Sequence, residues 1–133
     1  MKMTDQTQNN ETDRKRRILV IDDNHDAADT LSMMLKLKGN NVETQYDGYQ
    51  GIAAAERFLP DIVVLDIGMP GLDGYQTCQL IRGTEWGKTI RIFALTGYGQ
   101  PNDFQKSTDV GFNAHLLKPV DLAELLSLIE QKD

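Results

Sequence analysis

Three aspartates and one lysine stand where apolar segments of the chain end. Asp22 and Asp23 close the run RILVIDD, Asp66 closes DIVVLD, and Lys118 follows AHLL. Continuous runs of Val, Ile and Leu are typical of strands buried on both faces of a parallel sheet, so these side chains are predicted to share one rim. Two carboxylates about 4 Å apart repel by roughly 4 kcal/mol at an effective dielectric near 20, and a hard cation such as Mg²⁺ would relieve that repulsion.

This combination of residues suits phosphoryl transfer, which depends on positioning and on neutralisation of charge. Mg²⁺ commonly takes one or two carboxylates and keeps several waters, which leaves positions for phosphate oxygens. Thr96 ends another apolar run and can donate a hydrogen bond to a phosphoryl oxygen, while Lys118 supplies a compact positive charge. Asp66 suits the role of a nucleophile that forms an aspartyl phosphate, because Asp22 and Asp23 are adjacent and better placed to hold the metal.

Each of these residues also has a plain structural explanation when taken singly. An aspartate after a strand often caps the next helix, as Asp23 could. A threonine before a glycine is ordinary turn chemistry, and a lysine before a proline is usually a surface residue. Their joint occurrence at the same end of four predicted strands favours the functional interpretation.

Five apolar segments alternate with five helical patterns along the chain. The expected strands are Ile18–Ile21, Val42–Gln45, Ile62–Leu65, Ile90–Leu95 and Ala114–Leu117. The expected helices are Asp26–Lys38, Gly48–Phe58, Gly74–Arg82, Asn102–Val110 and Asp121–Gln131. On the first helix, one face is expected to carry Ala27, Leu31, Leu35 and Leu37. This alternation predicts an α/β domain whose parallel sheet is covered by helices on both faces.

Composition limits the class of protein. The chain has 133 residues, of which 40% are apolar and 26% charged, and its formal net charge is −6. These values are typical of one soluble domain and argue against a surface that binds nucleic acid directly. A single cysteine, no membrane-spanning apolar run and no signal peptide favour a cytoplasmic protein. Residues 1–15 are expected to be a disordered polar tail, and residues 16–133 the folded domain.

Four motifs, VIDDN, VVLDIGMPGLDGY, ALTGYG and AHLLKPV, carry a resemblance to a known family. The chain resembles the receiver domain of two-component response regulators from about Arg17 to Glu130. Its ALTGYGQ and HLLKPVD runs are similar to those of receiver modules in hybrid sensor kinases. The resemblance implies a single-domain (βα)5 flavodoxin-like fold with strand order 2-1-3-4-5. It also implies a switch that catalyses its own phosphorylation and dephosphorylation without being an enzyme in the usual sense.

The resemblance assigns a role to each residue of the rim. It implies that Mg²⁺ is held by Asp22, Asp23, Asp66 and the backbone carbonyl of Gly68. Asp66 would accept a phosphoryl group from a histidine kinase or a histidine phosphotransfer protein. Thr96 would contact that group and Lys118 would pair with it, with a cis Lys118-Pro119 bond.

Two positions depart from the family pattern. His115 lies three residues before Lys118, where the family mostly has a Tyr or Phe that rotates as a switch. Gly68, two residues past Asp66, cannot shield a phosphoryl group as a larger side chain would. We expect the surface read by partners to comprise the fourth helix, the last strand and the fifth helix, with His115 and Tyr98 on it. His25 is expected to be a solvated residue at a helix start, since Mg²⁺ prefers oxygen ligands.

Other functions fit the sequence less well. A flavodoxin-like cofactor carrier would need a hydroxyl-rich loop after the first strand, where Asp22 and Asp23 would repel a phosphate. A metal-dependent phosphatase would have its nucleophile there, with a second aspartate two residues on, and this spacing is absent. An adaptor that had lost phosphorylation would be expected to lack an acid or the lysine. Because no output domain is expected after the last helix, signalling should occur by protein–protein contact with a downstream partner or by phosphate relay. The tail that begins at Met1 favours a stand-alone regulator over an excised module.

Overall fold

The computed structural model describes residues 15–97 and 108–131. Within these ranges five strands alternate with four helices. The strands are β2 (Arg17–Ile21), β3 (Asn41–Gln45), β4 (Ile62–Asp66), β5 (Arg91–Thr96) and β6 (Ala114–Leu117). The helices are α2 (His25–Leu37), α3 (Gly48–Phe58), α4 (Gly74–Arg82) and α6 (Leu122–Glu130). All five expected strands and four of the five expected helices are therefore confirmed. Most of the remaining one, expected at Asn102–Val110, lies outside the described residues, as do residues 1–14 of the expected tail.

The sheet has the order β3-β2-β4-β5-β6, and every neighbouring pair is parallel. Counted from the first strand this is the order 2-1-3-4-5, so the flavodoxin-like prediction is confirmed. The order makes β2 and β4 neighbours, with Ile21 opposite Leu65. Asp22 and Asp66 follow these two residues directly, so the topology places both at the carboxyl edge of the sheet.

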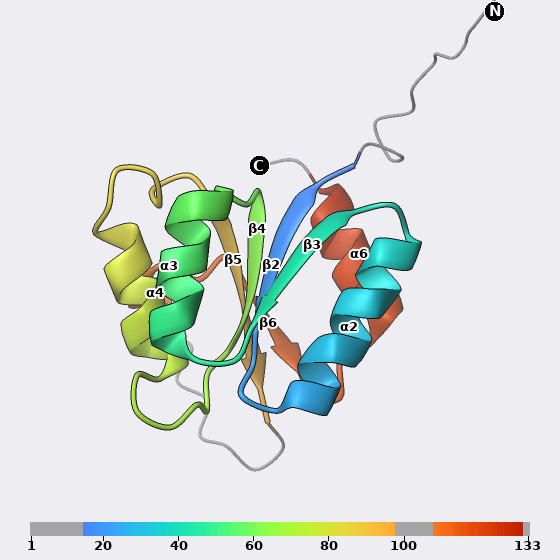
Figure 1. Ribbon diagram of the computed structural model, residues 1–133, viewed down its shortest axis with the longest axis horizontal. Helices are drawn as coiled ribbons and strands as arrows, with labels where there is room; N and C mark the ends of the chain where they lie inside the picture. The colour runs from blue at the N-terminus through green and yellow to red at the C-terminus, as the bar shows by residue number, and fades with distance from the viewer. Residues whose placement is uncertain (1–14, 98–107, 132–133) are drawn as a thin grey trace, which may run out of the picture.

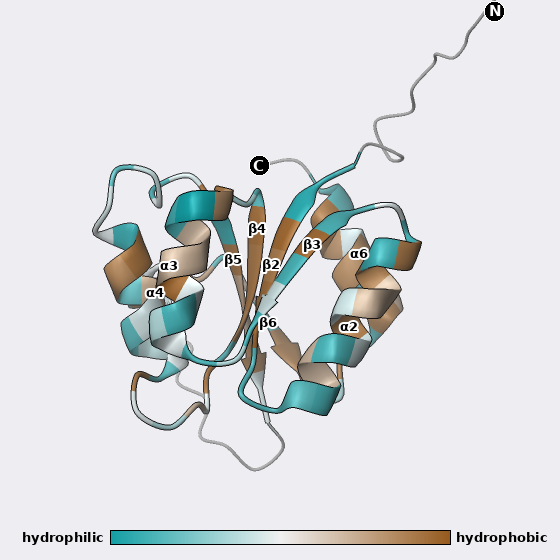
Figure 2. Ribbon diagram, viewed as in Figure 1, coloured by the Kyte–Doolittle hydropathy of each residue, from teal (hydrophilic) through white to brown (hydrophobic). Residues whose placement is uncertain are grey.

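Side chains of successive strand residues point to opposite faces, and each face has its own apolar core. Helices α3 and α4 cover one face, and α2 and α6 cover the other (Figure 1). Figure 2 shows the brown, hydrophobic strands between the two pairs of helices, and buried helix residues such as Leu35 of α2 and Ile81 of α4 belong to the two cores. In β4, Val63 and Leu65 belong to the core under α3 and α4, whereas Ile62 and Val64 belong to the other core. This two-sided burial explains the continuous apolar runs of the strands.

Every described helix begins at an Asp or Asn side chain that accepts a backbone N–H of the first turn. These caps are Asn24, Asp47, Asp73 and Asp121. Such caps typically stabilise a helix by about 1 kcal/mol. Because Asn24 caps α2, Asp23 is not used as a helix cap, and the structural explanation for that residue does not apply.

The buried face of α2 differs from the one expected. Its buried residues are Ala28, Leu31, Ser32 and Leu35. Ala27 is exposed, and Leu37 is 80% exposed. The buried set follows the i, i+3, i+4, i+7 spacing of a helix face, whereas position 37 is two residues past position 35 and so lies on the opposite side. Both assignments were therefore wrong.

Arg82, at the end of α4, joins segments that are far apart in the sequence. Its guanidinium donates hydrogen bonds to the carbonyl oxygens of Gly87, Ile90 and Gly111, at 2.8, 2.6 and 2.7 Å. Nearby, the buried Cys78 thiol donates to the Val110 carbonyl, and burial raises its pKa to about 11. The thiol is therefore protonated and unreactive at neutral pH. Within the described part of the chain, no helix has the length and apolar character needed to cross a membrane.

Candidate functional site: an acidic cluster at the carboxyl edge of the sheet

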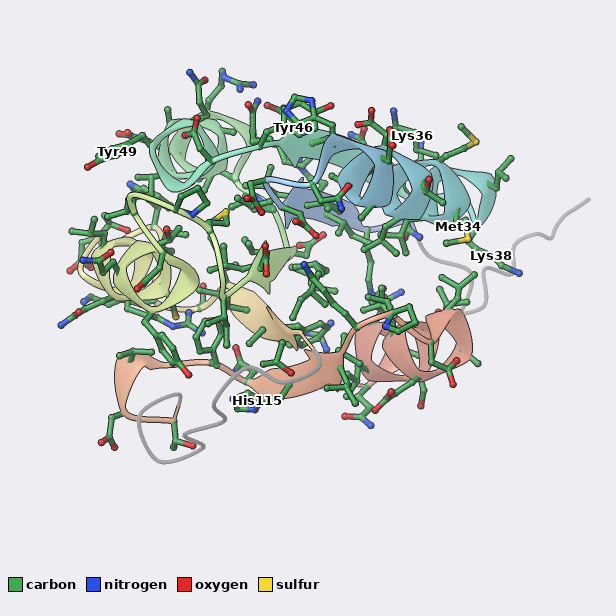
Figure 3. All side chains as sticks on the ribbon, turned by 90° about the horizontal axis from the view of Figure 1, so that it is seen from below. Met34, Lys36, Lys38, Tyr46, Tyr49 and His115 are labelled. Atoms are coloured by element: carbon green, nitrogen blue, oxygen red, sulfur yellow. The ribbon has the colours of Figure 1, made fainter. Side chains whose placement is uncertain are left out.

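Three carboxylates meet where β2 and β4 end. Asp22, Asp23 and Asp66 each offer an oxygen, and these oxygens lie within 4.8 Å of one another. Asp22 is 2% exposed and Asp66 is 3% exposed, whereas Asp23 is open to solvent. Figure 3 looks onto this edge of the sheet. The convergence expected from the two apolar runs is therefore present in the structure.

Lys118 closes the cluster from the other side of the site. Its Nζ lies 3.2 Å from Asp22 Oδ2 and 3.1 Å from Asp66 Oδ1. The Lys118 N–H donates to the carbonyl of Thr96, and the Lys118-Pro119 bond is cis, as predicted. Lys118, which directly follows β6, thus bridges the two buried acids Asp22 and Asp66 at the carboxyl ends of β2 and β4.

The charges of the cluster alter the pKa values of its members. Burial raises the pKa of Asp22 above its ordinary value, and the nearby Asp66 adds to this effect. The hydrogen bond from the Asn24 N–H and the charge of Lys118 oppose it only in part. For Lys118, burial acts against the charged ammonium, but Asp66 and then Asp22 outweigh it and raise its pKa. Lys118 is therefore protonated, whereas Asp22 ionises less readily than an ordinary aspartate.

Two further residues of the expected site lie beside Asp66. Thr96 ends β5 and is 5% exposed, with its Oγ1 3.5 Å from the carbonyl oxygen of Leu116. This contact is long, so the hydroxyl is available to a better acceptor. The Gly68 N–H donates to Asp66 Oδ1 at 3.1 Å and holds the carboxylate against its own loop. The role of the Gly68 carbonyl as a metal ligand remains a prediction.

Comparison with known families agrees with this geometry. The pattern of the response regulator receiver domain matches residues 18–130. The chain belongs to the response regulator receiver domain family. The family resemblance expected from the sequence is thereby confirmed. The general role of this family is response regulator signalling.

Individual relatives differ in how much of their length the receiver domain matches. It is 36% identical over 114 residues to protein PilG of Pseudomonas aeruginosa, covering 86% of this chain and 84% of PilG. It is 36% identical over 113 residues to the DNA-binding dual master transcriptional regulator RpaA of Synechocystis sp., covering 85% of this chain but 47% of RpaA. The receiver domain of the sensor histidine kinase PA1611 from Pseudomonas aeruginosa has a TM-score of 0.79 and 32% identity, covering 88% of this chain and 96% of that one. That structure holds a magnesium ion in its active site cleft.

Gly74, which the sequence analysis did not single out, fixes the position of the Asp66 loop in this receiver domain. It is the first residue of α4, and its N–H donates to the Ile67 carbonyl at 3.0 Å. A Cβ on Gly74 would lie 2.5 Å from Ile67 Cα and 2.6 Å from the Asp66 carbonyl oxygen. Both are backbone atoms, so only the absence of a side chain lets α4 approach the loop this closely.

We therefore expect Gly74→Ala to lower the free energy of unfolding by about 2 kcal/mol, as overpacking of a close contact does. The helix must move away from the loop, so the same variant should also bind Mg²⁺ more weakly. Urea denaturation and a Mg²⁺ titration followed by NMR would measure the two effects. Gly83→Ala is the matched control, because a Cβ there meets nothing closer than 3.5 Å. Equal behaviour of the two variants would contradict this role for Gly74.

The remaining residues of interest lie around the cluster. His115 is half-buried on β6, with its ring centroid 6.0 Å from that of Phe112. Tyr98 lies outside the described residues. His25 is exposed and stacks on Tyr46 at 3.8 Å between ring centroids, so it is solvated on one side but partnered on the other. This stack could not be predicted from the sequence, because the two rings lie 21 positions apart and come from different segments.

Proposed function

We propose that this receiver domain is a phosphorylation-dependent signalling switch. Asp66 accepts a phosphoryl group from a histidine kinase or a histidine phosphotransfer protein, and the modified domain signals by contact with a downstream protein. The observation that supports this best is the position of Lys118, whose ammonium lies within 3.2 Å of carboxylate oxygens from both Asp22 and Asp66. A structural ion pair would need one acid, whereas phosphoryl transfer needs the whole set.

The cluster also fits a divalent cation. When every group is ionised, the three carboxylates and the Lys118 ammonium carry a net charge of −2, and the three carboxylate oxygens lie within 4.8 Å of one another. The three acids offer carboxylate oxygens, and Mg²⁺ prefers oxygen ligands. We propose that Asp22, Asp23 and Asp66, with the Gly68 carbonyl, hold Mg²⁺. When bound, the ion would offset the repulsion between the acids and attract phosphoryl oxygens.

The roles of the protein groups follow from their positions. An oxygen of Asp66 attacks the phosphorus, and the bond from phosphorus to the donor's imidazole nitrogen breaks. The hydroxyl of Thr96 and the ammonium of Lys118 donate hydrogen bonds to the transferred group. Hydrogen bonds to charged groups are worth about 1.5–3 kcal/mol each. Two of them would supply much of the roughly 5.5 kcal/mol needed to move a switch from 1:99 to 99:1.

Intact-protein mass spectrometry tests the proposal. The chain is incubated with acetyl phosphate and Mg²⁺, and separately with a phosphorylated histidine phosphotransfer protein. We expect one phosphoryl adduct per chain, removed by hydroxylamine and located on the peptide that contains Asp66. An adduct on a different peptide, or none from either donor, would count against the proposed function.

We propose that partners read the edge of the sheet formed by β6 and its flanking helices. Leu117 on β6 is 55% exposed, and His115 lies on the same strand. Thr96 is opposite Leu117 in the register, so a change at Thr96 is one strand away from this edge. Tyr98 and the expected fourth helix belong to the same proposed surface.

The pH range in which His115 titrates is shifted from the ordinary one. Burial lowers the pKa of His115, so its imidazole is neutral at pH 7. The unfolded chain takes up the proton at the ordinary pKa, near 6.5, before the folded chain does. The free energy of unfolding of the wild type should therefore fall relative to that of His115→Tyr as the pH drops from 7.5 to about 5.5. Urea denaturation at both pH values measures this difference, and a constant difference would contradict it.

A further inference from the structure

Tyr46, in the turn between β3 and α3, holds the first turns of α2 through two contacts. Its ring stacks on the imidazole of His25, with 3.8 Å between the ring centroids and 9° between the ring planes. Its hydroxyl donates a hydrogen bond to Asp29 Oδ1 at 2.6 Å, and this bond raises the pKa of Tyr46, so the hydroxyl keeps its proton at neutral pH. His25 and Asp29 are four residues apart and therefore lie on one side of the helix, where a single side chain can contact both.

The residue before Tyr46 is bonded to the acidic cluster itself. The Asp22 N–H donates to the Gln45 carbonyl at 3.1 Å, directly after the paired residues at the ends of β2 and β3. On the other side of the acid pair, His25 is two residues past Asp23 and lies under the Tyr46 ring. Two consecutive residues of one turn therefore hold both ends of the loop that carries Asp22 and Asp23.

Asp23 depends most on this anchoring. Asp22 and Asp66 are 2% and 3% exposed, and both are ion-paired with Lys118. Asp23 is exposed to solvent. Ordering an exposed side chain and its loop around an ion costs conformational entropy. That cost is smaller when the backbone on either side of the residue is already held in place.

We propose, resting on the proposed function, that Tyr46 is a positioning residue that holds Asp22 and Asp23 in place for a divalent cation. Tyr46 does not contact the ion. It acts through His25 and Asp29, which fix the start of α2 and with it the loop of the two acids. Holding a site in its bound geometry strengthens binding by reducing the cost of ordering.

The affinity for Mg²⁺, followed through the NMR signal of the Gly68 amide, measures this role. Tyr46→Leu removes the stack and the hydrogen bond, and should raise the Kd for Mg²⁺ about tenfold, the lower end of the range for outer partners of metal ligands. Tyr46→Phe keeps the stack and should raise the Kd roughly threefold, since an exposed hydrogen bond contributes modestly. Because Tyr46 packs against the core under α2, Tyr46→Phe decides the matter if Tyr46→Leu is unfolded. His25→Phe keeps a stacked ring and should retain the wild-type Kd.

Two controls separate positioning from a general loss of stability. Tyr49→Leu changes a tyrosine that is 70% exposed and lies on the far side of α3 from Tyr46 (Figure 3). Ile81→Val loosens the core on the opposite face of the sheet from α2, where Ile81 is fully buried. Both controls should bind Mg²⁺ with the wild-type Kd, although Ile81→Val should be less stable to urea.

Hydrogen exchange gives a second readout that needs no bound ion. The Asp22 amide, which is bonded to Gln45, should exchange about tenfold faster in Tyr46→Leu than in the wild type, because local opening becomes easier, and at the wild-type rate in Tyr49→Leu. An unchanged Kd or an unchanged exchange rate in Tyr46→Leu would overturn this inference and leave the metal site in place. A Kd that rises as much in His25→Phe would also overturn it, because the imidazole would then be a ligand. No binding of Mg²⁺ by the wild type would overturn the proposed metal site as well.

Discussion

The Asp66→Asn variant is expected to take up no phosphoryl group from acetyl phosphate under conditions that modify the wild type. An amide has no carboxylate oxygen to attack phosphorus, so the loss should be complete rather than partial. The substitution keeps the size of the side chain, and Asn can still accept the hydrogen bond from the Gly68 N–H. Intact-protein mass spectrometry over time would measure the loss.

Asp26→Asn is the matched control for this experiment. Asp26 lies in the first turn of α2, close to the same edge of the sheet, but is not a member of the acidic cluster. Its substitution changes the charge by the same amount and should leave the phosphoryl adduct intact. An adduct that persists in Asp66→Asn would show that another residue is the acceptor.

The Lys118→Met variant should lose about 3 kcal/mol of stability at pH 7 without Mg²⁺. Removing one partner of a buried ion pair typically costs about 3–5 kcal/mol, because the other charge stays buried. The lower value applies because the Lys118 side chain is 28% exposed. Asp22 and Asp66, at 2% and 3% exposure, would then face each other without a counter-ion. Lys38→Met, an exposed lysine of the same chain, should be nearly neutral.

The pH dependence of this loss has a definite sign. The pKa of Asp22 is already raised by burial, and without Lys118 it should rise further. The folded variant then binds more protons than the unfolded chain above about pH 4. Its stability deficit should therefore shrink when the pH is lowered from 7 to 5, and also when Mg²⁺ is added. Urea denaturation under the three conditions measures this, and a deficit that stays the same in all three would contradict the role given to Lys118.

Much of the fold could be predicted because strands that are buried on both faces of the sheet appear in the sequence as continuous apolar runs. The runs before Asp22 and Asp66 predicted two neighbouring strands of the sheet, whereas the one helix cap considered, Asp23, is not used, because Asn24 caps α2. The cluster could be predicted for the same reason, since parallel strands place their carboxyl ends at one edge. The face of α2 was misjudged at Leu37, because a few apolar residues fit more than one helical face.

Other features depend on contacts between elements and leave little trace in the sequence. Gly74 looks like an ordinary helix-start glycine until the Asp66 carbonyl oxygen is seen 2.6 Å from where its Cβ would be. His115 could be recognised as unusual, but only its burial against the sheet determines the direction of its pKa shift.

The order of the chain determines when the acidic cluster acquires its counter-ion. Asp22 and Asp23 directly follow β2, and Asp66 ends the neighbouring strand β4, so all three are synthesised before Lys118, which follows β6 at the edge of the sheet. Domains emerge from the ribosome with the N-terminal part first. A nascent chain can thus pair β2 with β4 before Lys118 is present to balance the acids. A divalent cation should therefore matter more to the growing chain than to the finished protein.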